Sequence, residues 1–153
     1  MHHFGGGYTD LKLTSKKWGE FFNIIASSSK MALGYAELSH GIPHIAGDFG
    51  EVLRHSHTEL IGLCSFIFKK KTVLTAEWLS KTDALLDLKQ PLLKLNPAQH
   101  PMDQTGIMLP NGEVSSYPLR WAELLGEIFH PLIYRYRNEI QKEPIEPAFS
   151  EYR

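Results

Sequence analysis

Residues 118–137 read PLRWAELLGEIFHPLIYRYR, and their apolar side chains recur at the spacing of one face of an α-helix. Pro118 suits the first turn of such a helix, and Pro131 predicts a kink near His130. The predicted stripe consists of Trp121, Leu124, Leu125, Ile128, Leu132 and Tyr136, with Phe129 and Ile140 on its flank. This is the clearest helical pattern in the chain, and it indicates a mostly helical fold.

A long first helix is predicted over residues 16–38, with Ser15 as its N-cap. Its apolar residues form two stripes, and a helix that is apolar on two sides packs on a partner as well as on its own core. The wide stripe consists of Trp18, Phe21, Phe22, Ile25, Ser29, Ala32, Leu33 and Ala36. The narrow stripe consists of Ile24, Met31, Tyr35 and Leu38.

Two more helices are predicted between these patterns. Glycine and proline in residues 40–47 interrupt the first helix, and Asp48 caps a second one that runs to about Phe68. Thr75 caps a third helix, which Pro91 is expected to end. Residues 91–104 have weak periodicity and are expected to be irregular.

A small β-hairpin is predicted over residues 106–116, with strands at 106–109 and 113–116 and with Gly112 at positive φ in the turn. The expected fold is therefore mostly α: an irregular four-helix bundle with one small β-hairpin and extended N- and C-terminal arms. The expected division is an arm at 1–14, a helical domain at 15–142 and an extended tail at 143–153.

Composition limits the class of protein. A chain of 153 residues has the size of one domain, and a formal net charge of −1 disfavours a nucleic-acid binder. Cys64 is the only cysteine, so no internal disulfide can form. The sequence shows no secretory signal, no Arg-rich transit peptide and no apolar run long enough for a transmembrane helix. We expect an intracellular protein, either cytoplasmic or in an organelle such as the mitochondrion.

Histidines around a Gly-Pro turn suggest one alternative, a small metal-binding protein or metalloenzyme that uses the His-rich residues 40–57. His40, His44 and Glu37 are the candidate ligands, and imidazole with carboxylate suits zinc, iron or manganese. Glu-x-x-His occurs at Glu37 and again at Glu127, as in di-metal bundles. The helical stripe, however, predicts that Glu127 and His130 point away from the core, where they could not form such a centre.

The favoured hypothesis is a non-enzymatic structural or accessory subunit of a larger protein assembly, such as an organellar complex or a viral particle. It is expected to bind its neighbours through the first helix and the terminal arms. Tyrosine and arginine alternate near residue 136, and these residue types dominate interface hot spots. The predicted partner-binding residues are Ile24, Met31, Tyr35, Tyr134, Tyr136, Arg137, Phe149 and Tyr152. Residues 69–71, three lysines, leave peripheral membrane contact as a further alternative, against which the near-zero net charge argues.

Overall fold

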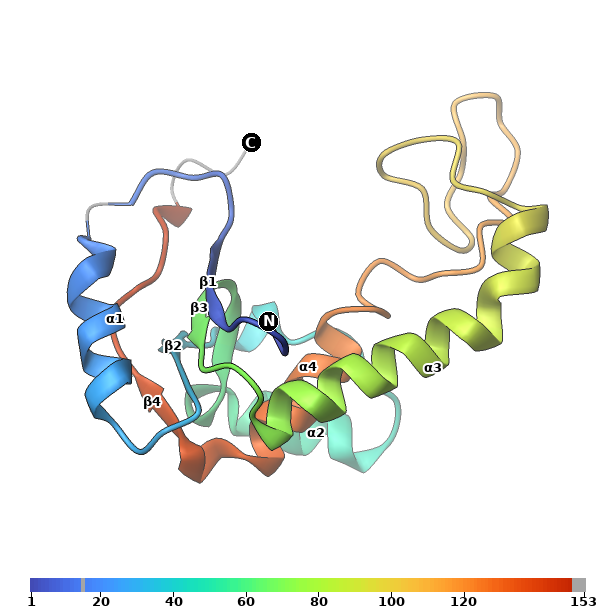
Figure 1. Cartoon of the computed structure of the whole chain (residues 1–153). Helices are drawn as coiled ribbons and strands as arrows, with labels where there is room; N and C mark the ends of the chain where they lie inside the picture. The colour runs from blue at the N-terminus through green and yellow to red at the C-terminus, as the bar shows by residue number, and fades with distance from the viewer. Residues whose placement is uncertain (15, 150–153) are drawn as a thin grey trace.

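The computed structural model describes residues 1–14 and 16–149, which form four α-helices and a four-stranded mixed sheet (Figure 1). The expectation of a mostly α four-helix bundle is therefore wrong, because the chain has an α/β fold. The predicted N-cap Ser15 and the predicted contact residue Tyr152 lie outside the described residues.

The strands lie in the order β1-β3-β2-β4; β3 is antiparallel to β1 and to β2, and β4 is parallel to β2. The strands are β1 Gly6–Thr9, β2 Ala32–Ala36, β3 Ile61–Phe68 and β4 Ile140–Lys142. The helices are α1 Trp18–Ser27, α2 Asp48–His55, α3 Val73–Leu95 and α4 Gly126–Arg135. Short 3₁₀ turns occupy Ser39–Gly41, His57–Glu59 and Arg137–Glu139.

β3 corrects the predicted helix over residues 48–68, which ends at His55 as α2. The run Ile61–Phe68 is apolar on both sides, and most of it is buried. A short apolar run of this kind has no alternation, so periodicity alone does not separate a central strand from a buried helix. Its β-branched and aromatic residues suit a strand covered on both faces.

β2 corrects the predicted helix over residues 16–38 in the same way. α1 ends at Ser27, whose hydroxyl donates to the backbone carbonyls of Asn23 and Ile24. Serine side chains compete in this way for helical hydrogen bonds. The chain then turns back as β2, so Met31 and Tyr35 do not belong to a face of α1.

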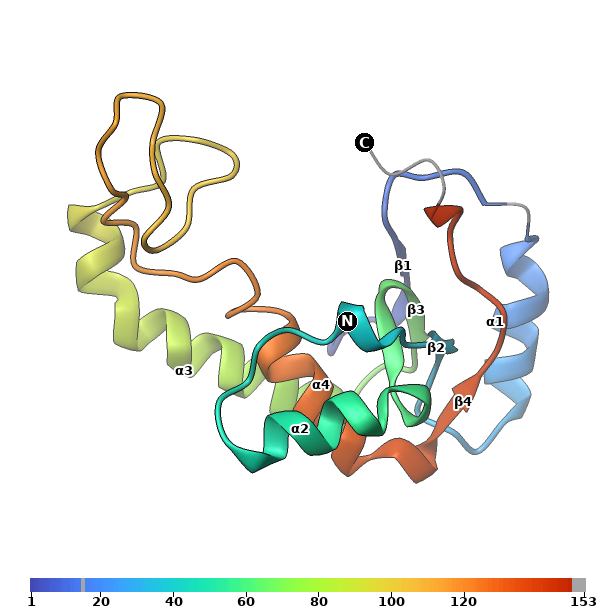
Figure 2. The ribbon, with the colours of Figure 1, turned by 180° about the vertical axis from the view of Figure 1, so that it is seen from behind.

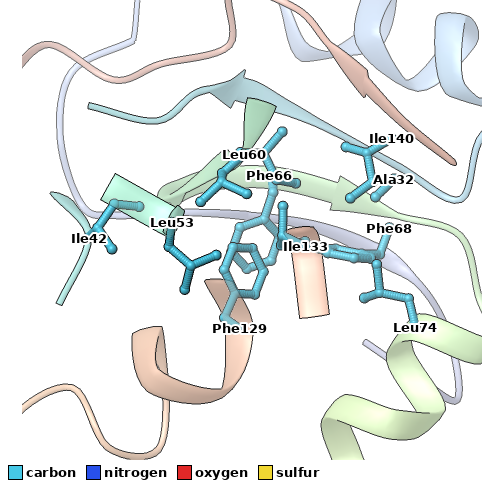
Figure 3. Packing of buried hydrophobic residues seen from close by; sticks show 11 residues of the cluster. Ala32, Ile42, Leu53, Leu60, Phe66, Phe68, Leu74, Phe129, Ile133 and Ile140 are labelled. Atoms are coloured by element: carbon cyan, nitrogen blue, oxygen red, sulfur yellow. The ribbon is translucent and has the colours of Figure 1, made fainter. Parts of the chain in front are cut away.

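Alternating residues of the two central strands enter two separate cores. One core lies between the sheet and α2, α3 and α4; Figure 3 shows Phe66 and Phe68 of β3 meeting Phe129 and Ile133 of α4 there. The other core lies between the sheet and α1. It consists of Phe21, Ile25, Leu33, Tyr35, Ile67 and Ile145. The molecule is thus a three-layer α/β/α arrangement, with α1 alone on one face (Figure 2).

Both predicted arms contact the sheet. Residues 6–9, expected to be an extended arm, form the edge strand β1, and Gly5 before it takes φ +69°. A Cβ at Gly5 would meet the Phe68 carbonyl oxygen at 2.7 Å, so only glycine fits this close approach. In the tail, Ile145 is buried and the Ala148 N–H donates to the Leu13 carbonyl at 2.9 Å.

Two predicted helix ends also differ from the structure. α4 begins at Gly126 rather than near Pro118, because residues 121–125 form turns. α3 continues through Pro91 to Leu95. Pro91 lies on an exposed side of α3, and the following segment folds back on the helix; the Lys89 ammonium donates to the Pro118 carbonyl at 2.7 Å.

The hairpin region contains a single β-bridge, Met108 to Val114, and no longer strand among the residues described. Gly112 has φ +84°, which confirms its predicted positive φ. No helix in the described ranges is both long and apolar enough to cross a membrane.

Candidate functional site

α3 carries the first candidate site. Its second half extends away from the sheet, and residues 96–117 lie at its far end (Figure 1). Glu123 binds the Lys89 ammonium at 2.5 Å, and the Ser116 hydroxyl donates to the Asn96 side-chain oxygen at 3.0 Å. These two contacts attach the chain at residues 116–123 to one side of α3 and leave the other side open. We call residues 83–117 the arm; this name does not refer to the terminal arms predicted from the sequence.

Two acidic side chains accept hydrogen bonds at the folded loop of the arm: Asp103 lies within the loop, and Glu123 follows it in the chain. Burial acts to raise the pKa of Glu123, but hydrogen bonds from the Lys89 ammonium and the Arg120 N–H outweigh it and lower that pKa. The Ser115 hydroxyl and the Gln99 N–H both donate to Asp103, and these bonds lower the pKa of Asp103. Both carboxyl groups are therefore held in the charged form.

The open side of α3 is apolar. Leu88, Leu92 and Leu95 are spaced by four and three residues, so they share one helix face. They are 76%, 51% and 76% exposed, respectively. We call these three residues the leucine row. The periodicity of α3 contained this signal, but the sequence alone did not show that the fold leaves this face uncovered.

A pocket of about 670 Å³ is the second candidate site. Its walls come from the turn after β2, from β3, from residues 121–126 and from Phe149. Most of the lining is apolar or aromatic, including Tyr35, Leu63 and Trp121, and the polar groups are few. Such a combination is typical of sites for small molecules.

Glu37 is the charged group of this pocket, and it is buried, with its side chain 5% exposed. Its Oε1 accepts the Leu38 N–H at 2.9 Å, and its Oε2 lies 3.0 Å from His130 Nε2. Gly41 lies directly against the carboxylate, where any Cβ would collide with it. The pair joins the end of β2 to α4 across 93 residues of sequence.

His130 is fully buried, which corrects the prediction that it points away from the core. That prediction extended the helical phase from residues 121–125, which are not helical; the helix that begins at Gly126 buries Phe129, His130, Leu132 and Ile133. Sequence reasoning noted Glu37 and His130 in two separate Glu-x-x-His motifs. The structure instead pairs the Glu of the first with the His of the second.

The second ring nitrogen of His130 has no partner among the described residues. Nδ1 is buried without a hydrogen bond, whereas Nε2 lies 3.0 Å from Glu37 Oε2. A proton on Nε2 lets the imidazole donate this hydrogen bond to the carboxylate. The pair therefore places a buried carboxylate and a buried imidazole side by side at the end of β2.

Cys64 and Tyr35 lie in the same pocket. The Cys64 N–H donates to the Tyr35 hydroxyl at 3.4 Å. Burial raises the pKa of the Cys64 thiol, and burial together with the Glu37 charge raises the pKa of Tyr35 well above its ordinary value. Both groups stay protonated at neutral pH, so neither is an activated nucleophile.

The predicted metal ligands do not converge. Glu37 lies in the pocket and binds His130, while His40 and His44 are exposed. The Glu37 backbone carbonyl lies 2.9 Å from His57 Nδ1. Within residues 1–14 and 16–149, no group of three His, Cys, Asp or Glu side chains is arranged to hold a metal ion.

The predicted partner-binding residues mostly make contacts within the chain. Ile24 and Met31 pack against the two cores, and Tyr35 is buried. The Tyr136 hydroxyl donates to Glu77 Oε1 at 2.6 Å.

Three more of these residues also have neighbours in the chain. The Arg137 guanidinium lies 4.2 Å from the ring centre of Tyr134 and pairs with Glu59 at 2.9 Å. Tyr134 itself packs on the larger core. Phe149 packs edge-on against Tyr35, with the ring centres 5.6 Å apart.

Comparison of the chain with protein-family models, with curated proteins and with solved structures finds no match. The geometry of the leucine row and of the pocket therefore carries the functional assignment.

Proposed function

We propose that this protein is a non-enzymatic accessory subunit that binds another protein through the leucine row of α3. The observation that carries the proposal is the exposure of Leu88, Leu92 and Leu95 on one face of a helix that extends beyond the sheet. Contiguous exposed apolar surface on a soluble domain marks an interaction site.

The energetics support this reading. The exposed parts of the three side chains amount to about two whole leucines, and their burial would contribute roughly 3–6 kcal/mol. Met102 and Met108 on the arm are also more than half exposed. Leucine spacing of this kind suits packing against a helix or an apolar groove of a partner.

The contact surface differs from the one expected from sequence, which placed binding on the first helix and the terminal arms. Tyr35 is buried, and residues 6–9 are already paired with β3. The arm has no comparable covering among the described residues on its open side.

The test is affinity capture of the tagged chain from its native cells, followed by mass determination of the purified complex. The double variant Leu88→Gln/Leu95→Gln removes the row, and Leu86→Gln is the matched control because Leu86 is exposed on a different side of α3. A stoichiometric partner retained by the control and lost from the double variant supports the proposal. Capture of the same partners by both variants refutes it.

A further inference from the structure

The pocket beside β2 combines a buried acid with aromatic walls. Glu37 supplies the acid, and Tyr35, Trp121 and Phe149 supply aromatic rings. Its volume of about 670 Å³ is large enough for a small organic molecule. This site is separate from the leucine row, and its role does not depend on the proposed protein partner.

The electrostatics of the pocket favour a cation. Among the described residues, one hydrogen bond reaches each carboxylate oxygen of Glu37, from the Leu38 N–H and from His130 Nε2. A carboxylate offers about four lone-pair sites, so acceptor capacity remains. A buried carboxylate is costly unless it is paired and hydrogen-bonded, and an ammonium group in the pocket would add both a charge partner and hydrogen-bond donors.

Two basic side chains among the described residues lie near the pocket. His40 lines the pocket but is exposed to solvent. The Lys12 ammonium lies 3.0 Å from Asp10, 3.9 Å from the Cys64 sulfur and 5.6 Å from the ring centre of Phe149. The Phe149 ring thus already has a cation near it, as expected for an electron-rich aromatic face.

We propose that this pocket binds a small organic ammonium ion with an apolar body. The ammonium group hydrogen-bonds to the Glu37 carboxylate and lies against the aromatic rings, and the apolar body packs on Leu38, Ile42 and Leu63. Aromatic cages recognise amines and quaternary ammonium groups by this combination of charge and ring faces. An anionic ligand would be disfavoured beside the Glu37 carboxylate, and a neutral ligand would gain no charge–charge attraction to it.

Three probes of matched shape test the proposal: 2-phenylethylammonium, 2-phenylethanol and 3-phenylpropionate. Binding is followed by amide and indole NMR shifts of residues that line the pocket, including Trp121. The ammonium probe is expected to bind about tenfold or more tightly than the alcohol, and the carboxylate is not expected to bind. Equal binding of the ammonium and the alcohol, preference for the carboxylate, or no shift with any probe at about 10 mM overturns the proposal.

Two variants locate the charge and the ring. Glu37→Gln is expected to abolish the preference for the ammonium over the alcohol; an unchanged preference overturns the proposal. Because Glu37 is buried, a second variant is made at the exposed Trp121. Trp121→Leu is expected to weaken ammonium binding about two- to fivefold and leave alcohol binding unchanged. The matched control Phe22→Leu, an exposed aromatic of α1 outside the pocket, is expected to bind like the parent; equal losses in both aromatic variants contradict the assignment.

Discussion

Replacing His130 by leucine is expected to be one of the most destabilising single changes in the chain. The imidazole is fully buried, and it supplies the hydrogen bond to Glu37 Oε2 at 3.0 Å. Leucine fills a similar volume, so the loss comes mainly from the carboxylate and not from a cavity. Removing one partner of a buried pair that contains a charge costs about 3–5 kcal/mol, a large share of the roughly 5–15 kcal/mol that stabilises a typical domain.

The free energy of unfolding is measured by urea titration, with Trp78 fluorescence as a reporter because its ring centre lies 5.0 Å from that of Phe129. His44→Leu is the control, since His44 is exposed and its replacement is expected to cost less than about 0.5 kcal/mol. The double variant Glu37→Leu/His130→Leu removes the charge together with its partner. It is expected to cost at least about 1.5 kcal/mol less than the sum of the single variants. Strictly additive costs, or a loss below about 1 kcal/mol for His130→Leu, would refute the pairing.

Two further predictions concern the core and the arm. Phe129→Ala is expected to lower the free energy of unfolding by about 3–5 kcal/mol, since Phe129 is 1% exposed and packs against Phe66 and Trp78; a loss under about 1 kcal/mol in the same urea titration would contradict this packing. Glu123 and Asp103 have pKa values below their ordinary 4.5 and 3.8. Their contribution to the stability of the folded loop is therefore complete at neutral pH and is lost as the pH falls below those values. Amide NMR signals of residues 96–117 are therefore expected to lose dispersion in acid before those of β3, and Glu123→Gln should weaken this pH dependence; simultaneous loss in both regions would show that the two carboxylates do not hold the loop.

Sequence reasoning worked best where the structural signal is local. It located α1, α2 and α3 at approximately their observed starts, because amphipathic spacing acts within a few turns. The predicted N-caps Asp48 and Thr75 were wrong, since Gly47 and Thr72 occupy those positions. It also predicted the positive φ of Gly112, which depends on the turn alone. It extended the first two helices across β2 and β3, where a continuous apolar run fits either a buried helix or a central strand.

The candidate sites depended on tertiary structure to a greater degree. The sequence singled out Glu37, but as a metal ligand with His40 and His44, which lie exposed and apart from its carboxylate contacts. His130 was assigned to the wrong side of its helix because the helix begins at Gly126, eight residues later than Pro118. No local pattern relates residues 37 and 130, since their contact exists only after β2 and α4 pack together.

The sequence by itself determined the charge balance, the single cysteine, the approximate starts of three helices and the leucine spacing of α3. These properties follow from composition and from interactions between near neighbours in the chain. Only the tertiary structure decided that Ile61–Phe68 is a central strand, that the leucine row stays uncovered and that Glu37 meets His130 beside an aromatic pocket. The physical reason is that burial and pairing are non-local, because each depends on which distant segment covers a residue.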